Sequence, residues 1–309
     1  MGKVLNTFAL AREILFMAVK SIGWAVYALF FLSLFAQASE YGEAIEIDAI
    51  LSAPIQLSHS ASAQPFVVVS DYDDTVKVTH VLHSRDAVTS GFFGNDTFVG
   101  MSALFNAWQL SAQSMVYLSG SPQFMAARIT NTLAINKFPP GILILSNWLH
   151  KWTKWENVYT FKLNALMLER TKQNAAFLLI GDDTQSDAQV FLEYRKSNPD
   201  IQDNMPIYIH RVTGKALPQG VIAFWTAFEV ALNEFAEGRL NAQQTIEVGE
   251  AILRSDRYDL LFPNFIECPT NLTFALSSDA QHIPELMTLS KKLELKISNY
   301  CWDNSKYIL

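Results

Sequence analysis

The sequence has few charged residues and few cysteines for its length of 309 residues. Only 17% of the residues are charged, against about 25% in ordinary soluble domains, whereas 50% are hydrophobic. This composition excludes an intrinsically disordered chain, which requires low hydrophobicity and many charges. Two cysteines cannot form a disulfide framework, and a chain of this length buries enough surface to fold without one.

Basic residues are scarce as well, since 23 lysines and arginines stand against 30 acidic residues. The formal net charge is −7, and proteins that bind duplex nucleic acid usually present a basic face. Nucleic acid is therefore not an expected partner. No repeat with the period of a solenoid or a propeller is visible, and the length allows one large domain or two small ones.

The first 38 residues are organised like an export signal. Basic residues precede an uncharged apolar run at 21–35, and Ala36-Gln37-Ala38 follows it. This order predicts a signal peptide at residues 1–38, cleaved on export to a periplasm or on secretion. A membrane anchor is an alternative, because 21–38 is about the minimum length that spans a bilayer, and a buried core helix is another.

Short apolar runs alternate with helical patterns between residues 65 and 214. The apolar runs lie at 65–70, 114–118, 141–145, 176–180 and 205–209, and the helical patterns at 101–112, 123–136, 162–173 and 187–197. Strands that alternate with helices predict an α/β fold, with a mostly parallel sheet and helices on both of its faces.

The regions on either side of this domain have weaker patterns of secondary structure. Residues 39–64 show no helical or strand periodicity and are rich in Ser and Ala, which predicts a linker. Residues 215–309 contain helical patterns, notably at 222–237 and 242–253, and are expected to be a helical extension packed on the core. Cys268 and Cys301 lie in this extension, where they could pair in an oxidising compartment or remain as buried thiols.

Polar side chains follow several of the predicted strands. Asp71 and Asp73 come after the first strand, Ser119 after the second, and Asp182 after the fourth. Ligands of parallel α/β sheets bind at the carboxyl ends of the strands, so these residues mark the expected site. Two acids this close suit Mg²⁺ or a pair of nucleophile and proton donor, although such pairs are also common in solvated turns.

Four motifs in the chain resemble those of haloacid-dehalogenase (HAD) superfamily phosphatases. They are Asp71-Tyr72-Asp73-Asp74-Thr75, Val116-Tyr117-Leu118-Ser119, Phe161-Lys162-Leu163 and Gly181-Asp182-Asp183-Thr184-Gln185-Ser186-Asp187. Over about residues 65–214, the strings at 117–122, 138–141 and 179–182 further resemble the catalytic domain of the actin-patch-associated phosphatidate phosphatases. Gln123 and Asp183-Thr184 depart from that family's pattern but leave the catalytic groups intact. The resemblance implies a HAD-like, Rossmannoid fold with a minimal cap.

The resemblance also implies a Mg²⁺-dependent reaction through an aspartyl-phosphate. Asp71 would be the nucleophile, Asp73 the general acid and base, and Lys162 the cation that balances the charge of Asp71 and the phosphoryl group. Mg²⁺ would be held by Asp71, the backbone carbonyl of Asp73, Asp182 and Asp187. An exposed lysine on the protein surface is the alternative for Lys162.

A phosphoryl-binding turn is implied at Ser119, Gly120 and Ser121. The pattern Gly120-Ser121-Pro122 predicts the start of a helix, whose N-terminal amides favour an anion. Ser119 or Ser121 could instead serve only as the cap of that helix.

Other polar residues are expected to have structural roles. Asp74 and Asp183 fit turns beside the motifs, and Arg211 lies near the carboxyl edge of the sheet, where a structural role is favoured over substrate contact. The histidines have no metal-ligand spacing and are interpreted as loop or packing residues; they are His80, His83, His150, His210 and His282.

Little sequence is available to cover the site. Residues 76–100 would form a short flap with Phe92-Phe93 at its tip. Trp148, Trp152 and Trp155 recur on one helical face beside two lysines, which is typical of a peripheral membrane contact. A helix face packed on the core is the alternative, and we favour it.

Phosphatidate is the favoured substrate, with diacylglycerol and phosphate as products. The alternatives are a phosphatase of soluble phosphomonoesters, such as sugar phosphates or nucleotides, and an inactive relative that serves as a binding module. An intact set of Asp71, Asp73, Lys162 and Asp182 favours an enzyme.

Overall fold

The computed structural model describes residues 65–79, 94–146, 156–173, 175–200, 206–269 and 271–305. The expected export segment, the linker, the Phe92-Phe93 flap tip and the tryptophan-rich stretch at 147–155 lie outside these residues. Within the described ranges, no helix is both long enough and apolar enough to cross a membrane.

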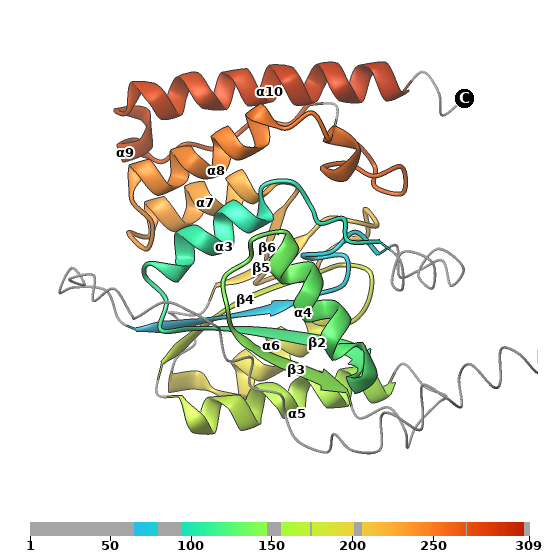
Figure 1. Ribbon diagram of the computed structural model, residues 1–309. Helices are drawn as coiled ribbons and strands as arrows, with labels where there is room; N and C mark the ends of the chain where they lie inside the picture. The colour runs from blue at the N-terminus through green and yellow to red at the C-terminus, as the bar shows by residue number, and fades with distance from the viewer. Residues whose placement is uncertain are drawn as a thin grey trace, which may run out of the picture. The chain divides into compact units, whose positions relative to one another are not determined.

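A six-stranded parallel sheet forms the centre of the described structure (Figure 1). Its strands, in spatial order, are β3 (Ile142–Ser146), β2 (Ser114–Pro122), β1 (Phe66–Asp71), β4 (Ala176–Asp182), β5 (Ile207–His210) and β6 (Ile222–Phe224). Every neighbouring pair is parallel. The predicted α/β fold is confirmed, and it is consistent with a Rossmann-like arrangement of the HAD type.

The central strands are buried because helices cover both faces of the sheet. All six residues of β1 are buried, in keeping with its continuous apolar run. Val68 belongs to the core on one face, while its neighbour Val67 belongs to the core on the other. The alternation of side chains along β1 therefore joins two separate cores through one sheet.

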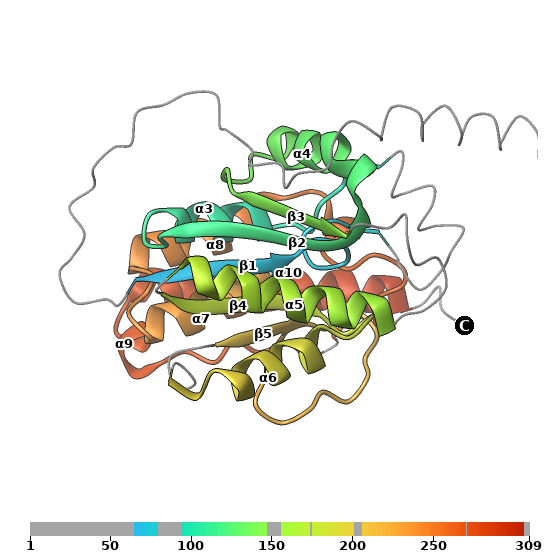
Figure 2. The same cartoon turned by 90° about the horizontal axis from the view of Figure 1, so that it is seen from below.

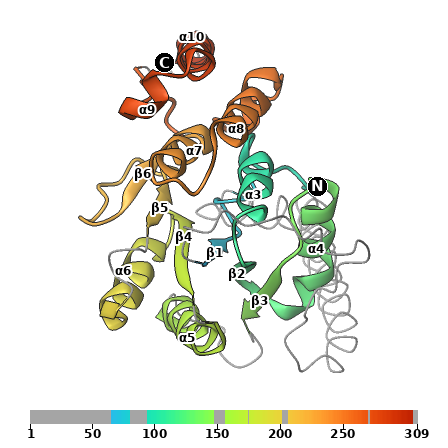
Figure 3. The same ribbon diagram turned by 90° about the vertical axis from the view of Figure 1, so that its left-hand side faces the viewer.

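The helices are divided between the two faces (Figures 2 and 3). One face is covered by α5 (Glu156–Lys172) and α6 (Asp187–Ser197), and the other by α3 (Met101–Gln109), α4 (Ala126–Ile135) and α7 (Ala227–Ala236). Beyond α3 and α7 lie α8 (Ala242–Arg254), α9 (Ser278–Gln281) and α10 (Pro284–Ser305). Residues of α7, α8 and α10 share one hydrophobic core with the sheet.

Two helix boundaries differ from the sequence predictions. The helix predicted at 222–237 is wrong at its start, because residues 222–224 form β6 beside β5. Helix α7 begins only after Thr226, whose capping box with Glu229 sets its first turn. The helix predicted from Lys162 begins six residues earlier, at Glu156, which places Lys162 in the second turn of α5.

Cys268 and Cys301 form a disulfide, with their Cα atoms 5.5 Å apart. Cys301 lies on α10 and is buried in the core, whereas Cys268 lies in the segment that precedes α9. The sequence left open whether these cysteines form a disulfide or remain as buried thiols, and the structure shows the disulfide. The bond links α10 covalently to the segment that precedes α9.

Candidate active site

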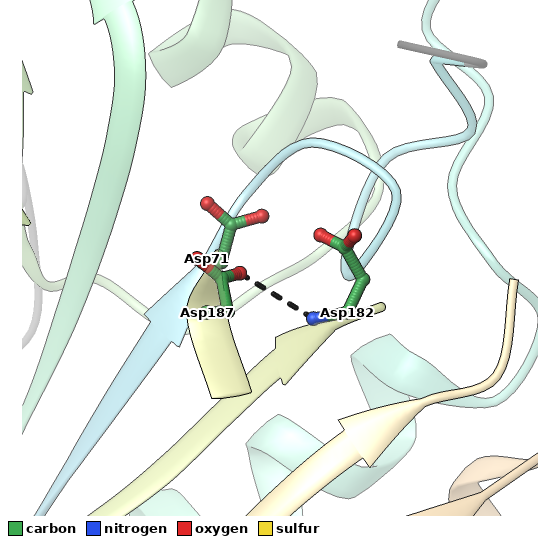
Figure 4. Close-up of side chains that lie close together, drawn as sticks. All are labelled: Asp71, Asp182 and Asp187. Atoms are coloured by element: carbon green, nitrogen blue, oxygen red, sulfur yellow. Dashed lines mark hydrogen bonds between the residues drawn. The ribbon is translucent and has the colours of Figure 1, made fainter. Parts of the chain in front are cut away.

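Three aspartates converge at the carboxyl edge of the sheet (Figure 4). Asp71 is the last residue of β1, Asp182 is the last residue of the neighbouring β4, and Asp187 is the first residue of α6. One carboxylate oxygen from each lies within 4.8 Å of the other two, and all three side chains are buried. The structure thus brings together three of the predicted metal ligands.

Lys162 reaches into this cluster from α5. Its Nζ lies 2.6 Å from Asp71 Oδ1 and 2.5 Å from Asp187 Oδ1, so one ammonium bridges two carboxylates. The residue is only 2% exposed, which excludes the alternative of a surface lysine.

Burial controls the electrostatics of the cluster. It raises the pKa of Asp71 from 3.8 to about 8, even though the ammonium of Lys162 acts in the opposite direction. Burial and the neighbouring carboxylates of Asp187 and Asp71 raise the pKa of Asp182 well above its usual range. Burial alone would lower the pKa of Lys162, but Asp187 and Asp71 outweigh it and raise this pKa. The cluster is therefore short of positive charge.

The donor set fits a hard divalent cation. When all three carboxylates are ionised, they and the one ammonium carry a net charge of −2 in a buried place, which a divalent cation would neutralise. Carboxylate oxygens are the ligands that Mg²⁺ and Ca²⁺ prefer. The Thr75 hydroxyl lies 3.4 Å from Oδ2 of both Asp71 and Asp182, so these two oxygens face a common space.

Gly181 allows Asp187 to approach β4. A Cβ atom at this position would lie 2.6 Å from Asp187 Oδ2, closer than side chains tolerate. The same oxygen accepts a hydrogen bond of 3.4 Å from the Asp182 backbone N–H, as the dashed line in Figure 4 shows. Glycine before Asp182 is thus required for close packing of α6 on the strand end.

Asp73 lies beside this cluster and is surrounded by hydroxyl groups. Ser119 and Ser121 each donate to Asp73 Oδ2 at 3.1 Å, and Thr79 donates to Oδ1 at 2.9 Å. Its carboxylate is partly exposed, in contrast to the buried triad.

The helix predicted to follow Gly120-Ser121-Pro122 is present, but its first turn is a 3₁₀ turn at Gln123–Met125 that leads directly into α4. Strand β2 continues through Pro122, because Pro122 pairs with Ser146 of β3 and the Ser146 hydroxyl donates to the Gly120 carbonyl at 2.7 Å. A 3₁₀ turn follows at Gln123–Met125, and no side chain caps it. Ser121 is therefore not a helix cap, and its N–H donates to Ser119 Oγ at 3.0 Å.

Residues 66–210 match the family described as phosphatidate phosphatase APP1, catalytic domain. This part of the chain is a phosphatidate-phosphatase-like catalytic domain. The matched segment runs from the first residue of β1 to the last residue of β5, and it contains Asp71, Asp73, Lys162, Asp182 and Asp187. The match confirms the resemblance of this domain to the phosphatidate phosphatases and supports a phosphoric monoester hydrolase. No curated protein sequence matches this chain.

Three threonines of the phosphatase domain contact its acids, although the sequence analysis assigned them no role. Thr75 lies between Asp71 and Asp182, and Thr79 binds Asp73. Thr184 donates its backbone N–H to Asp182 Oδ1 at 2.5 Å, and its hydroxyl donates to the same oxygen. Their positions two to six residues after an acid in the first and fourth motifs are the signal that could have identified them.

Other polar residues of the phosphatase domain stabilise its turns. Asp74 adopts a left-handed conformation (φ 55°), and its carboxylate accepts the Thr79 N–H at 2.9 Å. Asp183 Oδ1 accepts the N–H groups of Val212 and Thr213 at 2.9 and 2.7 Å. Arg211 lies over the ring of Trp225, 5.3 Å from its centroid. These contacts are structural, as the sequence indicated for Asp74, Asp183 and Arg211.

Proposed function

We propose that this protein is a Mg²⁺-dependent phosphatidate phosphatase, which converts phosphatidate and water into diacylglycerol and phosphate. The observation that carries the proposal is the buried cluster of Asp71, Asp182 and Asp187 around Lys162, within a domain matched to the phosphatidate phosphatases. A cluster of this kind combines a nucleophile, a fixed cation and oxygen ligands for a metal.

Asp71 and Asp73 would carry out the chemistry in two steps. In the first, an oxygen of Asp71 bonds to phosphorus while the ester bond breaks, and Asp73 gives its proton to the departing ester oxygen. In the second, the ionised Asp73 takes a proton from water. The water oxygen then bonds to phosphorus, and the bond to Asp71 breaks, which releases phosphate and restores both carboxyl groups.

The other residues of the cluster would hold the reacting groups. Lys162 binds one oxygen of Asp71 and restricts its orientation. Asp71 and Asp182 would hold the cation, which when bound supplies the positive charge that offsets the phosphate beside these carboxylates. Ser119 and Gly120, at the end of β2, are the proposed contacts of the phosphoryl oxygens.

A substrate panel tests this proposal directly. We expect phosphate release from phosphatidate in mixed micelles, dependent on added Mg²⁺ and abolished by a chelator. Release from soluble phosphomonoesters alone would favour a soluble-ester phosphatase instead. An absence of release from every ester, with Mg²⁺ present, would favour a binding module and overturn the proposal.

We expect Mg²⁺ to offset a loss of stability at high pH. The folded protein without a cation holds a proton on Asp71 up to about pH 8, whereas the unfolded chain releases it near 3.8. The free energy of unfolding should therefore fall as pH rises through this window, by at most about 1.4 kcal/mol per pH unit for one group.

Urea denaturation at about pH 5 and about pH 8, with and without Mg²⁺, measures this effect. Mg²⁺ competes with protons for the carboxylates, so it should stabilise the protein more at the higher pH. An equal effect of Mg²⁺ at both pH values would contradict a metal site at this cluster.

Export of the protein is also proposed. The Cys268–Cys301 disulfide supports it, because such bonds persist in oxidising compartments, and so does the export-signal pattern of residues 1–38. Sequencing the N-terminus of the mature protein should find residue 39 first, and an intact Met1 would exclude cleavage.

A further inference from the structure

The carboxylate of Asp73 is held from two directions. Thr79, six residues after Asp73, donates to Oδ1 at 2.9 Å, while Ser121 donates to Oδ2 at 3.1 Å from the end of β2. Both oxygens of the group are therefore restrained, although the residue itself is partly exposed. A proton donor must be aimed at its acceptor, so a restraint on both oxygens bears on the reaction.

The position of Thr79 is determined by its backbone. Its N–H donates to Asp74 Oδ1 at 2.9 Å, and its side chain is buried. Asp74 in turn donates its N–H to the Lys77 carbonyl at 2.8 Å, and its carbonyl lies 3.0 Å from His210 Nδ1 on β5. The turn that carries Thr79 is thus fastened to the sheet, and the hydroxyl has little freedom to move away from Asp73.

The contact with Thr79 is compatible with both states of Asp73 in the proposed reaction. Asp73 would be protonated in the first step and ionised before the second, and its one proton must face the ester oxygen, so that proton is not donated to Thr79. Oδ1 can accept the hydrogen bond from the Thr79 hydroxyl both when the proton is on Oδ2 and when the carboxylate is ionised. Thr79 can therefore hold Asp73 in both states.

Ser119 cannot provide this restraint throughout the reaction. Its hydroxyl donates to Asp73 at 3.1 Å, but the same group is a proposed contact of the phosphoryl oxygens. A hydroxyl has one proton to donate, so binding a phosphoryl oxygen would take Ser119 away from Asp73. Ser121 keeps its contact with Asp73 if Ser119 and Gly120 alone bind the phosphoryl oxygens, whereas Thr79 keeps its contact in either case.

We propose that Thr79 is a positioning residue that, together with Ser121, aims Asp73 at the ester oxygen of the substrate. This inference rests on the proposed function, since it concerns the proton that Asp73 gives to the leaving group. A poor leaving group needs that proton, whereas a good one departs with little assistance. Loss of Thr79 should therefore harm the hydrolysis of alkyl esters more than that of aryl esters.

The experiment compares Thr79→Val and Thr79→Ser on an alkyl phosphate and on p-nitrophenyl phosphate. We expect Thr79→Val to lower kcat/KM for the alkyl ester by about 10- to 100-fold, a fraction of what general acid catalysis supplies. The loss for the aryl ester should be below about threefold, and Thr79→Ser should restore both. The ratio kcat/KM is chosen because it reports the steps up to departure of the alcohol.

Thr245→Val is the matched control. Thr245 is a buried threonine on α8 whose hydroxyl donates to the Asn241 carbonyl at 3.0 Å, remote from the acids. We expect this variant to keep both activities. Circular dichroism melting establishes that each variant folds. If Thr79→Val does not fold, Ser121→Ala replaces it, and we again expect a larger loss of kcat/KM for the alkyl ester than for the aryl ester.

The outcomes are distinct. Equal losses on the two esters, or no loss on either, would overturn the role of Thr79 while leaving the phosphatase itself intact. A wild-type protein that hydrolyses neither these esters nor phosphatidate would overturn the proposed function, and the inference with it.

Discussion

Replacement of Asp71 by asparagine should abolish phosphate release and leave the protein folded. The amide is nearly isosteric and can still accept the hydrogen bond that Lys162 donates at 2.6 Å, but it cannot form a stable bond to phosphorus. We expect kcat to fall by at least about 1,000-fold, as losses of other nucleophiles do. Phosphate release at saturating substrate and Mg²⁺ is the measurement.

The Asp71→Asn variant should lose activity without losing stability. The substitution removes one negative charge from three buried carboxylates, so the free energy of unfolding near pH 8 should be unchanged or higher. Asp256→Asn, at an exposed aspartate outside the site, is the matched control and should keep full activity. Retained turnover in Asp71→Asn would show that Asp71 is not the nucleophile.

Replacement of Lys162 by methionine should be strongly destabilising. Methionine has a similar length but no charge, and it leaves Asp71 and Asp187 buried without the ammonium that bridges them. Removing one partner of a buried ion pair costs about 3–5 kcal/mol, so we expect a loss of this size in urea denaturation near pH 9, where Asp71 is ionised. The loss should be smaller near pH 5, where Asp71 holds a proton.

Lys196→Met provides the comparison for this effect. Lys196 is exposed on α6, and its Nζ lies 3.9 Å from Glu193. Exposed pairs contribute little, so this variant should differ from the wild type by less than about 1 kcal/mol. If Lys162→Met costs no more than Lys196→Met, the bridging of Asp71 and Asp187 by Lys162 would be refuted.

Local sequence patterns predicted most elements of the sheet. The first strand and α6 are found within a residue of their predicted bounds, because a buried strand and an amphipathic helix each carry a periodic signal of their own. The acids were predicted as well, since they follow buried strands of a parallel sheet, whose carboxyl ends lie along one edge.

The predictions failed where a distant segment decided the local structure. Gly120-Ser121-Pro122 correctly precedes a helix, but these residues were not predicted as strand, and a serine hydroxyl 26 residues further along the chain binds Gly120 where β2 extends. Residues 222–224 continue a helical pattern, yet pairing with β5 makes them a strand. In both places a tertiary contact outweighs a weak local preference.

The sequence by itself determined which acids, which lysine and which fold this protein has. Only the tertiary structure decided how they are paired: Lys162 binds Asp71 across 91 residues and Asp187 across 25, and Thr79, Ser119 and Ser121 gather around Asp73. The same holds for the disulfide between Cys268 and Cys301. The physical reason is that periodicity and composition are local properties, whereas a contact between side chains depends on how distant strands and helices pack.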